Sequence, residues 1–343
     1  MNRLLDGLGV SLPVLAAPMA GGSGTPAMVT AAARAGGMGF LAAGYRPAQA
    51  LAEQIDTVRA ENVPFGVNLF VPAPVPVAPQ DYRRYARAIQ PEADRYGIVL
   101  GAGEPVTDDD DWANKIDLLT ASPVPVVSFT FGVPDPAVVR ALRRSGTIVL
   151  QSVTSRDEAR QAAEAGVDGL VVQASAAGGH SATFTPERLP APVPLPDLIA
   201  DVRRGTALPI VAGGGIAGPA DVASALRAGA DATTVGTLLL RTDESGAAAP
   251  HKAALADPAF TETVLTRAFT GRPARGLRNR FIERYDAVAP MGYPALHHLT
   301  APLRKAATAA GDTRLIHLWA GTGYREARAE SVGRTLERLA GQL

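Results

Sequence analysis

The fold is decided by one recurring pattern, seen most clearly in Ser155-Arg-Asp-Glu-Ala-Arg-Gln-Ala-Ala-Glu-Ala165 with the following Gly166-Val-Asp-Gly-Leu-Val-Val-Gln173. Ser155, with Glu158 three residues later, is a typical helix start. The glycine that follows the alanine-rich helix provides the left-handed turn at its end. Because the strand after it is continuously apolar, we expect it to be covered on both faces, as in a parallel sheet.

Three other parts of the chain repeat this unit of helix, glycine and apolar strand, at 31–43, 138–151 and 221–235. With the remaining apolar runs, the sequence predicts eight strands, near 14–17, 39–43, 65–70, 125–130, 147–151, 169–173, 209–212 and 232–236. Eight strands separated by helices favour an α/β fold of the (β/α)8 TIM barrel type. An open, doubly wound parallel sheet is the structural alternative.

Two regions exceed what a barrel needs. We assign 1–70 and 122–240 to the barrel, 71–121 to an insertion after the third strand, and 241–343 to a mostly helical cap over the barrel mouth. The insertion combines a proline-rich stretch, a helix expected near 81–96 and an acidic run, Asp108–Asp111, that is typical of a solvated loop.

Composition excludes several classes of protein. The 343 residues carry 33 basic and 33 acidic side chains, so the zero net charge argues against a broad surface for nucleic acid or anionic membranes. The absence of cysteine rules out disulfides, thiolate metal sites and a cysteine nucleophile. Arg3 followed by the apolar Leu12–Met19 faintly resembles an export leader, but Asp6 and glycines interrupt it, so we expect a cytoplasmic protein.

Two glycine-rich loops are candidates for phosphate binding. They are Val211-Ala-Gly-Gly-Gly-Ile-Ala-Gly-Pro219, after the seventh predicted strand, and Thr234-Val-Gly-Thr237, after the eighth. Bare backbone amides at this position of a barrel bind phosphate without any charged side chain. The alternative for the glycine triplet is a simple tight turn. No Gly-x-x-x-x-Gly-Lys-Ser/Thr motif occurs, which argues against a nucleoside triphosphatase.

A third loop, Gln173-Ala-Ser-Ala-Ala-Gly-Gly-His180, follows the sixth predicted strand. Its glycines allow a planar ligand to approach, and His180 is expected to project over the mouth as an active-site residue. The alternative is a loop histidine bonded to backbone. His251 and His317 stand alone, and the adjacent His297 and His298 would diverge on a helix, so we predict no metal site.

Two amide side chains point to a heteroaromatic ligand. Asn68 ends an otherwise apolar strand and Gln173 ends another, and an amide offers both a donor and an acceptor to a ring edge. Each is equally compatible with a polar position inside the barrel. Together with a phosphate site, the two amides suggest flavin mononucleotide (FMN).

The ordered set of motifs resembles the class I nitronate monooxygenases, formerly called 2-nitropropane dioxygenases. The matching segments are Ala17-Pro-Met-Ala-Gly-Gly22, Ala35–Gly44, Gly66-Val-Asn-Leu-Phe70, Ser128-Phe-Thr-Phe-Gly132, Gln173–His180, Gly213-Gly-Gly-Ile216, Gly236-Thr237 and Trp319-Ala-Gly-Thr-Gly-Tyr324. The resemblance covers almost the whole chain. It departs from the family where Ser181-Ala182 follows Gly-Gly-His and where Thr322 replaces a common glutamine.

The resemblance implies an FMN-dependent oxidoreductase that oxidises alkyl nitronates such as propionate 3-nitronate with O2, by one-electron transfer, to a carbonyl product and nitrite. It implies that His180 is catalytic and that Tyr293, Arg304 and Tyr324 are candidates for closing the substrate pocket. The implied flavin contacts are Asn68, Gln173, Gly178, Gly215, Thr234, Val235, Gly236 and Thr237.

Two other functions remain open at this point. An FMN-dependent NAD(P)H:quinone or enoyl-acyl-carrier-protein reductase shares the barrel and the flavin and needs no Rossmann motif. A non-catalytic phosphate-binding barrel is the second. We expect small-molecule partners, a nitronate and O2, no nucleic acid or membrane, and a monomer or homodimer.

Overall fold

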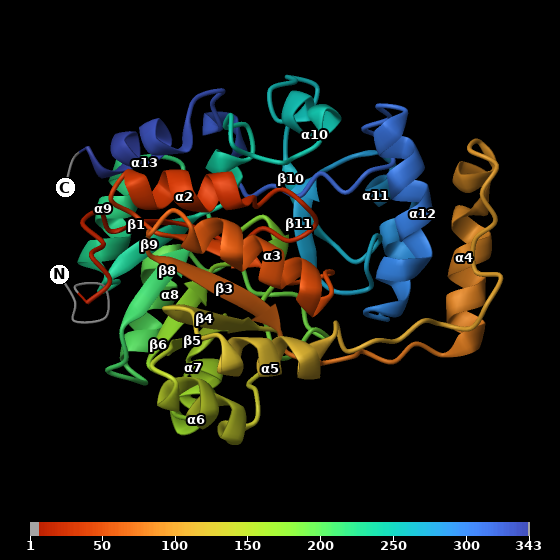
Figure 1. The fold of residues 1–343 in the computed structure, drawn as a ribbon. Coiled ribbons are helices and arrows are strands. Elements are labelled where there is room, and N and C mark those ends of the chain that lie inside the picture. Colours follow the sequence, from red (N-terminus) through yellow and green to blue (C-terminus); the bar gives the residue numbers. More distant parts are fainter. Residues whose placement is uncertain (1–6, 342–343) are drawn as a thin grey trace.

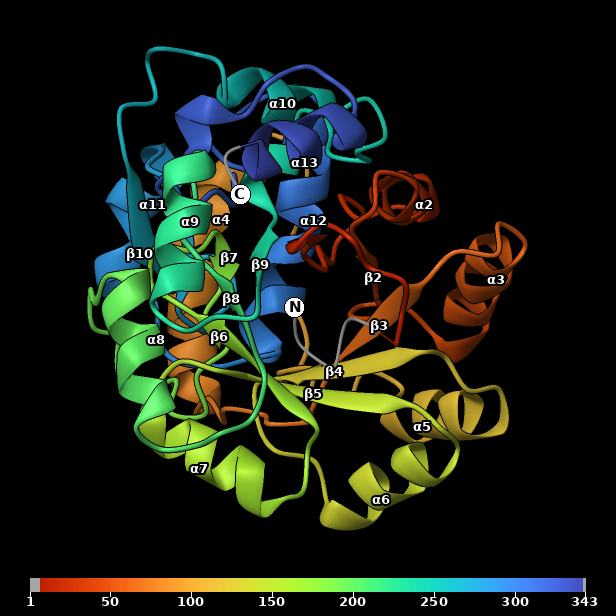
Figure 2. The ribbon, with the colours of Figure 1, turned by 90° about the vertical axis from the view of Figure 1, so that its left-hand side faces the viewer.

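The computed structural model describes residues 7–341 and contains a closed barrel of eight parallel strands (Figures 1 and 2). They are β1 (Val14–Ala16), β2 (Gly39–Ala42), β3 (Phe65–Phe70), β4 (Val126–Thr130), β5 (Ile148–Val153), β6 (Gly169–Gln173), β8 (Ile210–Gly213) and β9 (Ala232–Val235). Closure comes from β9, where Thr233 pairs with Val14 of β1. The predicted TIM barrel is confirmed and the open sheet is eliminated. Arg3, on which the leader resemblance depends, lies outside the described residues.

Helices surround the barrel (Figure 2). They are α2 (Pro26–Arg34), α3 (Ala48–Arg59), α5 (Trp112–Ala121), α6 (Pro136–Arg144), α7 (Arg156–Glu164), α8 (Leu195–Arg203), α9 (Pro219–Arg227) and α13 (Val332–Ala340). The last of these, α13, packs against α2, α9 and β1. The end of the chain therefore returns to the ring of barrel helices.

The local signals at the helix ends act as the sequence predicts. The Ser155 side chain accepts from Glu158 N at 3.2 Å, although the carboxylate of Glu158 bonds Thr154 N instead of closing a capping box. The other carboxylate oxygen of Glu158 accepts from Thr183 Oγ1 and Phe184 N, both at 2.8 Å. This helix start thus anchors the loop that follows His180. The four glycines after the repeated helices, Gly36, Gly146, Gly166 and Gly229, all have φ between 85° and 108°.

The cap lies beyond the carboxyl ends of the strands (Figure 1). Its helices are α4 (Pro79–Asp94), α10 (Ala249–Ala254), α11 (Arg280–Tyr285) and α12 (Ala295–Ala309). A small antiparallel sheet joins β10 (Thr263–Thr266), β11 (Ala274–Leu277) and β7 (Gly179–His180) in that order. Because β7 comes from the loop after β6, this sheet attaches the cap to the barrel next to His180. Three 3₁₀ turns, η1 (Thr237–Leu239), η2 (Asp286–Val288) and η3 (Tyr324–Glu326), complete the fold.

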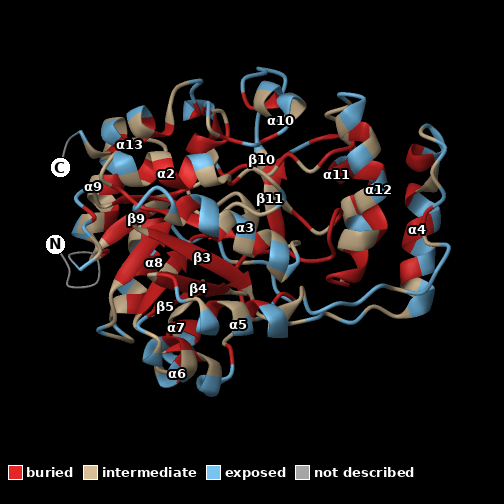
Figure 3. Ribbon diagram, in the orientation of Figure 1, coloured by how far each residue is buried: buried red, intermediate tan, exposed pale blue. Residues whose placement is uncertain are grey.

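The cap has an apolar core of its own. Tyr85 and Ile89 of α4 are buried in one cluster with Leu296 and Leu303 of α12 and Phe281 of α11. Figure 3 shows buried residues along the barrel strands and again along α12. The expected insertion helix begins at Pro79, two residues before the predicted start. Burial of these side chains gives α4 a defined position at the outer side of the cap.

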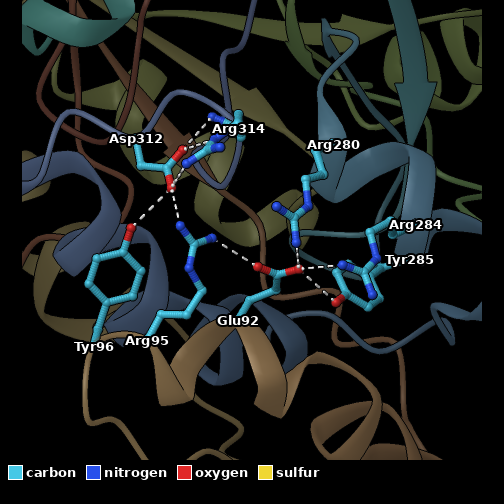
Figure 4. A network of polar contacts seen from close by, with 8 residues as sticks. All are labelled: Glu92, Arg95, Tyr96, Arg280, Arg284, Tyr285, Asp312 and Arg314. Atoms are coloured by element: carbon cyan, nitrogen blue, oxygen red, sulfur yellow. Dashed lines mark hydrogen bonds and ion pairs between the residues drawn. The ribbon is translucent and has the colours of Figure 1, made fainter.

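One buried carboxylate ties α4 to α11 (Figure 4). Glu92 Oε1 accepts from Arg280 Nη2 at 2.9 Å, Arg284 Nη1 at 3.0 Å and Tyr285 Oη at 3.1 Å, and Oε2 accepts from Arg95 Nη1 at 3.1 Å. Burial alone would raise the pKa of Glu92, but these hydrogen bonds and neighbouring guanidinium charges lower it. The arginines of this part of the cap therefore have an anionic partner within the protein.

Candidate active site

A cavity of about 530 Å³ lies at the carboxyl ends of the strands, between the barrel and the cap. Its walls include all the barrel residues singled out from the sequence, namely Asn68, Gln173, Gly178, His180, Gly215, Thr234, Val235, Gly236 and Thr237. From the cap side, Arg304 also lines it. The closed sheet brings these residues together because parallel strands all end at the same rim.

The loops after β8 and β9 form a cradle of bare amides, which we define as Gly214, Gly215, Gly236 and Thr237. Within the described part of the chain, the backbone N–H groups of these four residues donate no hydrogen bond. Gly214 has φ +113°, and a Cβ there would lie 2.8 Å from Ala174 O. These residues are half-buried and line the cavity, so their free N–H groups are suited to an anionic ligand such as phosphate.

The helix after the cradle contributes less than its position predicts. The carboxylate of Asp221 accepts from Ala217 N at 2.9 Å and from Gly218 N at 3.0 Å. These amides at the start of α9 are thus already paired. Thr237 Oγ1 accepts from Gly321 N at 2.9 Å and so holds the segment after Trp319 beside the cradle.

The two strand-end amides have different roles in the structure. Asn68 Nδ2 donates to Ser128 Oγ and Thr130 Oγ1, each at 3.0 Å, and no described residue donates to its Oδ1. Gln173 Nε2 donates to His180 O at 3.2 Å, and Gln173 Oε1 accepts from Ala182 N at 2.8 Å. The acceptor of Asn68 is thus free for a ligand, whereas Gln173 holds the backbone on both sides of Ser181.

The two glycines before His180 also differ. A Cβ at Gly178 would lie 2.5 Å from Gly321 N, so this position requires glycine because two loops pack closely. Gly179 has φ +76° and open space where a Cβ would stand. The requirement for glycine at 178 therefore comes from protein packing, although the residue lines the cavity.

His180 lies at the centre of the cavity wall. Its Nε2 is 2.9 Å from Thr270 Oγ1, and the ring centroids of Phe131, Tyr293 and Trp319 are each 5.7 Å away. Burial, followed by the charges of Arg272 and Arg304, lowers the pKa of His180 to about 3. The imidazole is therefore neutral at neutral pH.

Arg304 supplies a positive charge to the cavity. Its Nε donates to Thr300 Oγ1 at 3.1 Å, Nη1 to His317 Nε2 at 3.2 Å and Nη2 to His297 O at 2.9 Å. All these partners are neutral. Burial lowers the pKa of Arg304 to about 10, which leaves it a cation at neutral pH. A buried cation without a protein anion is unfavourable by itself, so the cavity favours an anionic ligand.

Side chains around Arg304 complete this end of the cavity. The His297 ring is stacked on Tyr45, with centroids 4.1 Å apart, and burial followed by the Arg304 charge lowers the pKa of His297 to about 2. Tyr293 Oη donates to Tyr45 Oη at 3.1 Å. Burial raises the pKa of Tyr45 to about 12, so its phenol keeps a proton that it can donate to a ligand.

The three substrate residues suggested by the sequence do not all reach the site. Arg304 lines the cavity, whereas Tyr293 does not line it but contacts His180 and Tyr45, which do. Tyr324 is buried, does not line the cavity, and donates its hydroxyl to Phe260 O at 2.6 Å.

Sequence reasoning missed the cavity residues Tyr45 and Thr270, and it considered His297 and His317 only as metal ligands. Trp319 stood in a segment that resembles the family but was given no role. The sequence signal for His297 is its place in an adjacent pair of histidines on a helix. Adjacent histidines on α12 diverge, as expected, and His298 Nε2 lies 2.6 Å from Asp108 Oδ2 of the acidic run while His297 enters the cavity. Nothing in the local sequence marks Tyr45 or Thr270.

Residues 7–341 lack both a metal-binding cluster and a membrane-spanning helix. No cluster of three or more His, Cys, Asp or Glu side chains is arranged to hold a metal ion. No helix in this range is both long and apolar enough to cross a membrane.

Comparison with known proteins covers the entire chain. The family model for nitronate monooxygenase matches residues 2–341. A probable nitronate monooxygenase of Staphylococcus aureus (strain Newman) is 34% identical over 350 residues, covering 100% of this chain and 97% of the relative. The crystal structure of a nitroalkane oxidase from Streptomyces ansochromogenes has a TM-score of 0.95 and 46% identity, and covers 100% of this chain and 98% of that one. FabK from Thermotoga maritima is less similar, with a TM-score of 0.76, 25% identity and coverage of 100% and 96%.

Proposed function

The chain belongs to the nitronate monooxygenase family and is an oxidoreductase, and we propose that it uses FMN and O2 to oxidise alkyl nitronates to a carbonyl product and nitrite. Arg304 carries this proposal. Its buried guanidinium faces the cavity with only neutral protein partners, and the same cavity is lined by the cradle of unpaired amides. A cytoplasmic location and a monomeric or homodimeric state belong to the same proposal.

The residues present fit FMN. The four amides of the cradle suit the phosphate, because a terminal dianion accepts several backbone hydrogen bonds at once. Gly214 leaves no room for a side chain, and Asn68 Oδ1 is free to accept from a ring N–H. Thr234 Oγ1 is buried without a partner in the described chain and adds a further polar group. The chemistry that bound flavin supplies is acceptance of one electron from the nitronate and transfer of electrons to O2.

The protein side chains bind and orient the anion. A nitronate is already a carbanion equivalent, so its oxidation requires no strong base. Arg304 balances its charge, and the Tyr45 hydroxyl can donate to an oxygen atom. Phe70, Phe131 and Trp319 line the cavity and limit the access of water, which strengthens these interactions.

We further propose propionate 3-nitronate as a substrate, with Arg304 holding its carboxylate. A guanidinium binds a carboxylate through two parallel hydrogen bonds, and this one lies on the cap side, away from the cradle. The matched comparison is propyl nitronate, which has the same chain length but no carboxylate. We expect propionate 3-nitronate to have the higher kcat/KM, and equal values would refute the role of Arg304.

An anaerobic visible spectrum of the FMN-loaded protein tests the reaction class. We expect propionate 3-nitronate to reduce the flavin, and subsequent O2 to restore its colour with formation of nitrite. Bleaching by NADH but not by the nitronate would favour the alternative reductase. Failure to take up FMN would favour a non-catalytic barrel.

A further inference from the structure

The backbone of His180 is held from two sides. Its strand β7 pairs with β11, and Ser181 N donates to Pro273 O at 2.9 Å. On the other side, Gln173 bonds both His180 O and Ala182 N. The imidazole therefore starts from a fixed position, and its orientation depends on what its ring nitrogens meet.

The ring is confined as well. Phe131 and Tyr293 meet it edge to face and Trp319 lies tilted against it. Its Nε2 faces Thr270 Oγ1 at 2.9 Å, and Thr270 is almost fully buried. Thr270 Oγ1 is also 3.3 Å from Arg272 O, to which it donates.

The position of the ring proton depends on where Thr270 directs its single hydroxyl proton. A hydroxyl has one proton, and when Thr270 donates it to a carbonyl, the hydroxyl oxygen accepts from His180 Nε2. A neutral imidazole has only one N–H, so Nδ1 then carries the lone pair. No described residue bonds Nδ1, and His180 lines the cavity.

We propose that Thr270 is a positioning residue that fixes the ring proton of His180 on Nε2, so that Nδ1 accepts the α-proton of a neutral nitroalkane. In this step the C–H bond breaks, an N–H bond forms at Nδ1, and the electron pair of the C–H bond moves onto the nitro group to give the nitronate. No oxidant is needed for it. The proposal rests on the proposed function, because the nitronate so formed is the species that is then oxidised.

The charges around His180 favour this step only when an anion is formed. Arg272 and Arg304 both disfavour an imidazolium at this position. The Arg272 guanidinium lies 4.0 Å from the centroid of the Phe131 ring and bonds Thr183 O. A developing nitronate brings negative charge into the cavity that His180 and Arg304 both line, and so offsets the repulsion.

The tautomer can be measured directly, because the chain has only five histidines. In ¹⁵N-histidine-labelled, FMN-loaded protein, two-bond ¹H–¹⁵N spectra distinguish a protonated from an unprotonated ring nitrogen, and His180→Asn assigns the signal. We expect an unprotonated Nδ1 and a protonated Nε2 in the native protein. In Thr270→Val the preference should be lost, and Thr270→Ser should restore it.

Kinetics provide the second readout. We expect Thr270→Val to lower kcat/KM for neutral nitroethane roughly 10-fold or more and to change that for preformed ethyl nitronate less than about 3-fold, since proton transfer is needed only for the first. Thr270→Ser should recover both. The matched control is Thr147→Val, which removes a buried hydroxyl that donates to Val124 O at the start of β5, away from the cavity.

Three outcomes would overturn the proposal: a protonated Nδ1 in the native protein, equal losses for the two substrates in Thr270→Val, or no loss for either. If the native protein oxidises no nitronate, the proposed function fails instead. The NMR result still decides the tautomer in that case, because it does not depend on turnover.

Discussion

The two ends of the cavity are suited to anions in different ways. At the barrel end, the cradle offers unpaired backbone amides and no charged side chain. At the cap end, Arg304 offers a full charge held by Thr300, His297 and His317. Backbone amides carry no net charge, so leaving them without a ligand costs less than leaving a buried guanidinium without an anion. The cradle is therefore suited to a permanently bound group and Arg304 to a ligand that comes and goes.

A second contrast lies within the cap. Arg280 and Arg284 share the carboxylate of Glu92 (Figure 4), while the hydrogen-bond partners of Arg304 are all neutral. The paired arginines hold two helices together, whereas Arg304 faces the cavity. Arg272 also lacks a carboxylate partner, but it bonds Thr183 O and does not line the cavity.

The largest expected effect is at His180, which lies between the two ends. Replacing His180 with Asn should leave FMN bound and lower turnover of a neutral nitroalkane roughly 100- to 10,000-fold, the range of a general base. Flavin absorbance and steady-state kinetics measure the two quantities separately. Unaltered kinetics would remove His180 from the mechanism.

Arg304→Met tests the cap end alone. We expect kcat/KM for propionate 3-nitronate to fall roughly 100-fold, about 3 kcal/mol, with FMN affinity unchanged. The melting temperature (Tm) of the variant should be equal to or higher than that of the native protein, because an apolar side chain of similar volume replaces an unpaired buried charge. Arg278→Met, at a half-exposed arginine paired with Glu262, is the control. Loss of FMN in Arg304→Met would show that the two ends are not independent.

Gly214→Ala tests the cradle alone. An alanine Cβ would lie 2.8 Å from Ala174 O, so the loop must shift, and we expect the displaced amides to bind FMN roughly 30-fold more weakly, about 2 kcal/mol. Fluorescence titration of the apoprotein with FMN measures this. Gly218→Ala, in the same loop but with open space around its Cβ, should bind FMN normally. Equal affinities for both variants would contradict the cradle.

The smallest effect concerns the paired arginines of the cap. Glu92→Gln should lower the free energy of unfolding in urea by about 1 kcal/mol at pH 7. Because the pKa of Glu92 is below its ordinary value of 4.5, its ionised form stabilises the protein above that pH, and the difference should shrink as the pH falls through the lowered pKa. Glu283→Gln, at an exposed residue on the same helix as Arg280 and Arg284, is the control. A difference independent of pH would contradict this account.

Much of the barrel side of the site could be read from local patterns. The eight predicted strands correspond to β1–β6, β8 and β9, and the glycine-rich loops after β8 and β9 line the cavity as expected. Local signals say less where one side chain has two possible uses. Gln173 lines the cavity as expected, but its amide also bonds the backbone around Ser181, a role that the sequence did not indicate. The hydroxyl of Tyr324 bonds a carbonyl and stays away from the cavity.

The repeated helix–glycine–strand unit determined the barrel, because periodicity and turn chemistry act over a few residues and are visible in any one copy. The same holds for the cradle, which needs only glycines after two strands. Tertiary structure decided three features of the site. They are the burial of Arg304 without an acidic partner, the position of His297 in the cavity, and the contact of Thr270 with His180. These features require segments about 100 residues apart to meet across the cavity. Burial then increases the free-energy cost of an unpaired charge and the strength of a single hydroxyl hydrogen bond.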